Sequence, residues 1–141
     1  MYWNLVNDRP IYIQLTEQIT QYIVSGVFEP GTRMASVREL AEDAGVNPNT
    51  MQRAMAELER NGLVKTHRTT GRMITEDMEM LNRIREDLAG ARITEFFDGM
   101  KTIGFSPREA AALLTKRADE MEDAAPADGA ADAEKKEGEA V

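Results

Sequence analysis

Two closely spaced helix-start signals constrain the fold of this chain more than any other feature. The run Ser36-Val37-Arg38-Glu39 has the form of a capping box, in which a serine hydroxyl and a glutamate carboxylate satisfy open backbone groups in the first turn of a helix. Gly45 ends that helix, and Asn47-Pro48 starts another, because asparagine is a good N-cap and proline fits the first helical position. We therefore expect helices over residues 37–44 and 48–61, joined by a three-residue turn.

Apolar periodicity and turn residues predict the remaining elements. Residues 11–25 have apolar side chains at helical spacing, which predicts a helix ahead of the turn unit. Residues 63–67 and 72–75 are β-prone runs around a glycine-containing turn, which is typical of a hairpin. Helical patterns follow over residues 76–104 and again from Ser106-Pro107. Whether the first of these two helices is continuous through Gly90 and Gly99 stays open, because interior glycine weakens a helix.

Helix, short helix, turn, helix and hairpin, in this order, make a winged helix-turn-helix. We predict a mainly α-helical chain with a small β-hairpin, in which a winged helix-turn-helix domain over residues 1–75 is followed by a two-helix C-terminal dimerisation unit over residues 76–123. Residues 124–141 are rich in Ala, Glu and Asp and can bury little apolar surface, so we expect a disordered acidic tail there.

Charge is distributed unevenly along the chain, and this bears on the choice of partner. The formal net charge is -8, and such acidity argues against nucleic acid, because a phosphate backbone is bound by positive charge. The last 23 residues hold nine acids and two lysines, however, and so supply -7 of the total. Residues 33–75 have seven Lys and Arg against five Asp and Glu. The acidity therefore belongs to the tail, and the winged domain is compatible with DNA.

The residue content excludes several classes of site. The chain has no cysteine and one histidine, which excludes disulfides, thiolate chemistry and a histidine-cluster metal centre. No histidine–carboxylate–nucleophile grouping or phosphate-cradling glycine loop is present, so we expect neither enzyme activity nor a cofactor or metal. No apolar run of about 20 residues and no signal-peptide pattern occur, so we expect a cytoplasmic protein without a membrane partner. Nothing indicates whether a small-molecule effector exists.

A winged helix-turn-helix inserts the second helix of its turn unit into a major groove, which singles out the polar residues there as DNA ligands. Asn and Gln can pair with adenine, Arg with guanine, and Thr can contact thymine or phosphate. The alternative for Arg53 is an ion pair with Glu57 one turn along the helix, and the alternative for Asn47 is a purely capping role. The candidate DNA-binding residues are Arg33, Ser36, Arg38, Asn47, Asn49, Thr50, Gln52, Arg53, His67, Arg68, Thr70, Gly71 and Arg72.

These motifs together resemble the DNA-binding domain of GntR-family bacterial transcription regulators, over about residues 9–75. The resemblance rests on residues 10–15, 31–41, 45–54 and 57–64 taken together. Many family members have a base-reading arginine at the places of Pro48 and Gln52, which this chain lacks. The Asn-Pro-Asn-Thr version is instead similar to the YtrA subfamily and to the DNA-binding part of the MocR subfamily. The resemblance implies that Arg38 contacts DNA and that Gly71 lets the wing approach it.

The two C-terminal helices have apolar stripes with little of their own chain to cover them, which favours self-association. The candidate dimerisation residues are Leu81, Ile84, Leu88, Phe96, Phe97, Leu113 and Leu114. The YtrA resemblance likewise implies that a short two-helix unit serves dimerisation. We expect a homodimeric, sequence-specific transcription regulator, a repressor, on a palindromic operator. The family resemblance further suggests a target in its own operon, often with an ABC transporter. The alternative is a winged-helix protein–protein interaction module without specific DNA binding.

Overall fold

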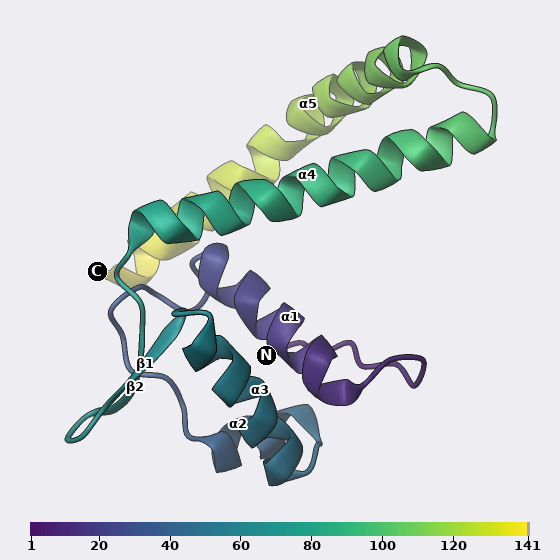
Figure 1. Cartoon of the computed structure of the whole chain (residues 1–141). Coiled ribbons are helices and arrows are strands. Elements are labelled where there is room, and N and C mark those ends of the chain that lie inside the picture. Colours follow the sequence, from purple (N-terminus) through teal and green to yellow (C-terminus); the bar gives the residue numbers. More distant parts are fainter. Residues whose placement is uncertain (141) are drawn as a thin grey trace. The chain divides into compact units, whose positions relative to one another are not determined.

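The helices and strands of the chain follow the predicted order, and the predicted fold class is confirmed (Figure 1). The computed structural model describes the backbone of residues 1–140 and the side chains of residues 1–124. The chain divides into two units, Met1–Ala89 and Gly90–Val141. The elements are α1 (Ile11–Val24), α2 (Val37–Ala44), α3 (Pro48–Arg60), β1 (Val64–His67), β2 (Gly71–Ile74), α4 (Met78–Thr102) and α5 (Pro107–Ala140).

The turn unit forms where the two capping signals predict it. The Ser36 hydroxyl accepts a hydrogen bond from the Glu39 backbone N–H at 3.1 Å and donates one to the Glu39 carboxylate at the same distance, which caps α2. Gly45 ends α2 with a φ of 69°, a left-handed conformation that glycine adopts readily. Asn47 Oδ1 accepts a hydrogen bond from the Asn49 backbone N–H at 2.8 Å and so caps α3. These local contacts fix both ends of the turn.

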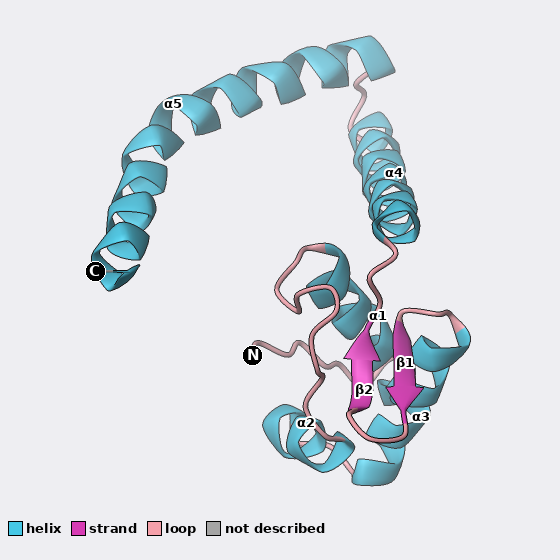
Figure 2. Cartoon of the chain, turned by 90° about the vertical axis from the view of Figure 1, so that its left-hand side faces the viewer, coloured by secondary structure: helices cyan, strands magenta, loops and turns pink. Residues whose placement is uncertain are grey.

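Helix α3 is held by a core that it shares with α1, α2 and β1. Its buried side chains are at helical spacing, so one face is apolar while the opposite face remains in solvent. Figure 2 shows these elements together with the hairpin. Fully buried core residues include Leu15 and Ile19 of α1, Leu40 of α2, and Met51, Met55 and Leu58 of α3. The packing fixes which side of α3 a ligand can reach.

The wing is an antiparallel hairpin with a third extended segment along its edge. β1 and β2 pair with Val64 opposite Ile74 and His67 opposite Gly71. The backbone before α2 runs along β2: Met34 N–H donates to the Arg72 carbonyl at 2.8 Å, and Ile74 N–H donates to the Thr32 carbonyl at 2.9 Å. The β-prone runs predict the hairpin but not this third segment, which carries Arg33.

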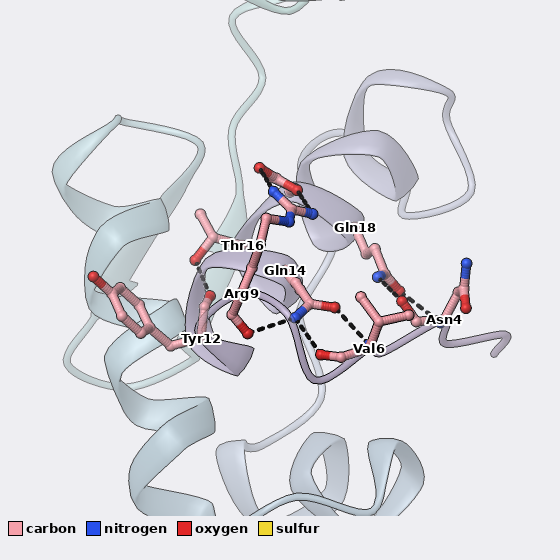
Figure 3. A network of polar contacts seen from close by, with 8 residues as sticks. Asn4, Val6, Arg9, Tyr12, Gln14, Thr16 and Gln18 are labelled. Atoms are coloured by element: carbon pink, nitrogen blue, oxygen red, sulfur yellow. Dashed lines mark hydrogen bonds and ion pairs between the residues drawn. The ribbon is translucent and has the colours of Figure 1, made fainter.

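Residues 1–9 form an N-terminal strap, which turns at residues 7–9 and is held against α1 by glutamine side chains (Figure 3). Gln14 is 1% exposed; its Oε1 accepts from the Val6 N–H, and its Nε2 donates to the carbonyls of Val6 and Arg9, each at 2.8 Å. Gln18 likewise exchanges two hydrogen bonds with the backbone of Asn4. The strap is thereby added to the first unit without a helix or strand of its own.

Helix α4 is continuous through Gly90 and Gly99, and its first turns belong to the first unit. Leu81 is 3% exposed and lies in the core of that unit, and Ile84 packs against the same core. The structure therefore corrects the assignment of Leu81 to the dimerisation surface, because its side chain is covered by its own chain. We predict a break after residue 75, whereas the first unit extends to Ala89, because the first turns of α4 pack against its core.

Helix α5 extends further than expected. Its backbone continues through Ala140, whereas we predict disorder over residues 124–141. Ala, Glu and Lys have high intrinsic helix propensity, which favours local helix even in a segment too polar to form a core. Residue 141 and the side chains beyond residue 124 lie outside the described residues, so the behaviour of the tail stays a prediction. Within the described residues, no helix combines the length and apolar character needed to span a membrane.

Candidate DNA-binding surface

The solvent face of α3 presents the polar side chains predicted to contact bases. Asn49, Gln52 and Arg53 are exposed and Thr50 is half-buried, while the apolar residues of the helix face the core. Asn47 is exposed as well, but its side-chain oxygen is engaged in the cap. The Asn47 amide nitrogen remains available at the N-terminus of α3. Next to it are the side-chain amides of Asn49 and Gln52 and the Thr50 hydroxyl. Helix N-termini carry open N–H groups and positive dipole charge, which favour phosphate.

Two arginines precede α3 in the chain and flank this surface. Arg38, in the first turn of α2, is exposed and forms no ion pair among the described side chains. Arg33 is exposed on the edge segment of the wing, and its Nε lies 3.7 Å from the position that a Cβ on Gly71 would occupy. Ser36 uses its hydroxyl in the α2 cap. The structure thus brings Arg33 to the wing turn, although the two are far apart in sequence.

The wing turn is polar and exposed. His67, Arg68 and Thr70 all face solvent. Gly71 has a φ of 81°, a left-handed conformation in which a side chain would be strained. This conformation explains why glycine occupies the turn, and an approach of its backbone to DNA stays a prediction for Gly71.

Arg72 has a different geometry from the other arginines. Its Nε donates to Glu59 Oε1 at 2.9 Å, and the Thr66 hydroxyl donates to the same carboxylate oxygen. The Thr66 hydroxyl and then Arg72 lower the pKa of Glu59, because both favour its charged form over the opposing effect of burial. Arg72 thus ties the wing to α3, and this geometry does not favour the outward role predicted for it.

Arg53 also has a partner that the sequence analysis does not anticipate. Its guanidinium carbon lies 3.7 Å from the centre of the Tyr12 ring, on α1. Glu57, the alternative partner considered for Arg53, pairs instead with Arg60 at 2.5 Å. The predicted alternative of an Arg53–Glu57 ion pair is therefore wrong.

The residues that organise this surface were missed by sequence reasoning. Thr66 and Arg72 lie directly opposite each other in the hairpin register, and both reach Glu59. Since cross-strand neighbours share a face of a hairpin, that pairing was the available signal for Glu59. Nothing in the local pattern identifies Tyr12, because its contact with Arg53 joins two helices far apart in sequence.

The second unit, unlike the solvent face of α3, exposes large apolar side chains. Phe96 and Phe97 of α4 have ring centroids 5.4 Å apart. Leu113 and Leu114 of α5 are each 44% exposed. Between the two helices lies an open groove of about 420 Å³, lined by Phe96, Met100, Leu113, Leu114, Lys116, Arg117 and Glu120. Four of the predicted dimerisation residues thus lie on or beside one groove. In the described part of the chain, no three His, Asp or Glu side chains are grouped as metal ligands would be.

Known proteins are similar to this chain in both sequence and fold. The family described as "Bacterial regulatory proteins, gntR family" matches residues 11–74. The HTH-type transcriptional regulator YhcF of Bacillus subtilis is 37% identical over 73% of this chain and 85% of its own length. The HTH-type transcriptional repressor YtrA of the same organism is 35% identical over 67% of this chain and 78% of its own. A GntR family transcriptional regulator from Listeria monocytogenes has a TM-score of 0.72 at 37% identity, covering 79% of this chain and 98% of that chain. This chain therefore belongs to the GntR family of bacterial transcriptional regulators and is a YtrA-like member of it.

Proposed function

We propose that this protein is a homodimeric, sequence-specific transcriptional repressor that binds a palindromic DNA operator. The observation that carries the proposal is the exposed polar face of α3, which begins at Asn47 and has Arg38, Arg33 and the wing turn around it. The major groove of DNA admits an α-helix, so the side-chain amides and hydroxyl of α3 can contact base edges there. The surrounding arginines can neutralise phosphates. The net charge of -8 does not oppose this, because the acidity is concentrated in the C-terminal tail.

The apolar surface of the second unit supports a homodimer. Large apolar side chains of this unit remain exposed, among them Ile93 at 51%, Ile103 at 68% and Met121 at 62%. Exposed apolar surface of this kind marks association sites in soluble proteins. A two-fold dimer would present two copies of α3, and these would require inverted half-sites about one helical turn, or a multiple of it, apart.

Repression and the target genes are inferred from the family resemblance. The relative YtrA of Bacillus subtilis is named a transcriptional repressor, and the match to it covers 78% of its length. By this resemblance the operator of this protein lies upstream of its own operon, with ABC transporter genes as further targets.

A fluorescence anisotropy titration against the upstream region of the gene tests the proposal. The wild-type protein should form a discrete complex that excess unrelated DNA does not abolish. Arg38→Ala should weaken binding to all DNA, because it removes a phosphate contact, whereas Asn49→Ala should lower mainly the preference for the operator. Arg85→Ala, an exposed arginine of α4, removes the same charge outside this surface and should bind as the wild type does.

Two outcomes would contradict the proposal. The first is the absence of any complex at low salt, which would favour the protein–protein interaction module. The second is a complex whose affinity is unchanged by both Arg38→Ala and Asn49→Ala, which would move DNA binding to another surface.

A further inference from the structure

The stacked pair Tyr12 and Arg53 joins two helices at the edge of the DNA-binding surface. The guanidinium carbon lies 3.7 Å above the ring centre, well within the range over which a cation and an aromatic face attract each other. Tyr12 is in the first turn of α1 and half-buried, and the body of α1 packs against α3. The ring is therefore held by the core, while Arg53 itself is exposed.

Helical spacing places Arg53 at the margin of the residues suited to reading bases, beside Asn49 and on the side of α1. At about 100° per residue, Asn49, Gln52 and Ala56 follow one another along the outward ridge of α3. Arg53 lies about 100° around the helix from Gln52 and about 40° from Asn49, on the side of α1 and its Tyr12 ring. A side chain on the flank of a recognition helix faces the wall of the groove, where the phosphates lie, rather than the base edges at its floor.

The contact with Tyr12 leaves the N–H groups of the Arg53 guanidinium open to a ligand. Tyr12 covers one face of the planar group, and Arg53 forms no ion pair among the described side chains. The N–H groups of a guanidinium project in its plane, so a stacked arginine can still donate two parallel hydrogen bonds to a phosphate. Stacking further restricts a long side chain that would otherwise lose rotamer freedom on binding.

We infer that Tyr12 is a positioning residue that holds Arg53 as a phosphate ligand at the flank of α3. This inference rests on the proposed function, because it requires that α3 bind DNA. It assigns Arg53 to the sequence-independent part of the affinity, whereas pairing with guanine would make it a specificity determinant.

Affinities for operator and unrelated DNA, each measured over a range of salt, test the assignment of Arg53. Arg53→Ala should weaken binding to both DNAs by the same factor and reduce the salt slope by about two for a dimer, since one phosphate contact is lost per subunit. A loss confined to the operator would overturn the phosphate role. If wild-type protein binds and Arg53→Ala binds equally well, the inference fails while the proposed function stands. If wild-type protein does not bind, the proposed function itself fails.

Variants of Tyr12 test the positioning role. Tyr12→Phe keeps the aromatic face and should bind as the wild type does, whereas Tyr12→Leu should weaken binding to both DNAs by about twofold to fivefold per subunit. In the Arg53→Ala background, Tyr12→Leu should have no further effect, because it acts through Arg53. Equal effects of Tyr12→Leu in both backgrounds, or a Tyr12→Phe protein as weak as Tyr12→Leu, would overturn the role. Thermal unfolding checks that each variant is folded, and Tyr12→Met replaces Tyr12→Leu if that variant does not fold.

Discussion

A single buried amide at Gln14 joins the N-terminal strap to the DNA-binding unit. Its side chain is 1% exposed and makes three hydrogen bonds to the strap backbone, each at 2.8 Å. A buried polar side chain that forms all its hydrogen bonds stabilises the fold, and removing it leaves its partners without a hydrogen bond. Gln14 thus makes more of the hydrogen bonds to the strap than Gln18 does, and composition and periodicity do not distinguish it from the other glutamines of α1.

We predict that Gln14→Leu lowers the free energy of unfolding by about 1–2 kcal/mol, because three backbone groups lose their partner. Urea denaturation followed by the fluorescence of Trp3, the one tryptophan of the chain, measures the change. Gln21→Leu makes the same substitution at an exposed position of α1 and should change stability little. Equal effects of the two variants would contradict the role of Gln14.

Glu59 makes the attachment of the wing depend on pH. Hydrogen bonds from Thr66 and Arg72 hold the pKa of Glu59 below its ordinary value of 4.5. The unfolded chain therefore binds this proton more tightly than the folded one, so the stabilisation is present above pH 4.5 and is lost as the pH falls through the folded pKa.

Glu59→Gln should accordingly reduce stability at pH 7 by less than about 1 kcal/mol, since the pair is partly exposed. The difference from wild type should shrink as the pH is lowered below 4.5. Denaturation at several pH values measures it, with Glu42→Gln as the matched change at an exposed position of α2. A difference that stayed constant with pH would show that ionised Glu59 does not stabilise the wing.

At the scale of elements, local signals were sufficient for the turn unit. The predicted spans of residues 37–44 and 48–61 agree with α2 and α3 to within one residue, because Ser36, Gly45 and Asn47 act through contacts a few residues away. Contacts between distant segments were not predictable in the same way. The edge segment along β2, the Tyr12–Arg53 stacking and the burial of Leu81 each require knowledge of how elements pack.

The cap of α2 provides a direct test at this scale. Ser36→Ala should lower the free energy of unfolding by about 1 kcal/mol, because the Glu39 N–H loses its acceptor. Ser36→Thr retains a hydroxyl at the same position and should remain close to wild type. Urea denaturation compares the three proteins, and an alanine variant as stable as the wild type would show that the cap contributes nothing.

At the scale of the whole molecule, the apolar groove of the second unit carries the proposed dimer. A charge introduced there would have to be buried without a partner when two chains associate, which is costly. We predict that Leu114→Glu weakens self-association by about tenfold or more, and with it operator binding. Sedimentation velocity measures the association.

Ala112→Glu is the matched control for this change. By helical spacing, Ala112 lies on the side of α5 opposite the buried Ala110, and it is exposed. It should leave the dimer intact. A Leu114→Glu protein that associates as strongly as Ala112→Glu would place the interface elsewhere.

The salt dependence of operator affinity tests the central claim, that an acidic chain binds DNA through a basic local surface. Arg33, Arg38, Arg53 and Arg68 are all exposed at or beside α3 and the wing. If each of these four arginines contacts one phosphate, a dimer makes about eight such contacts. We then expect a plot of the logarithm of the binding constant against the logarithm of the salt concentration to have a slope of about -7. A slope near zero, or affinity that rises with salt, would contradict DNA binding through this surface.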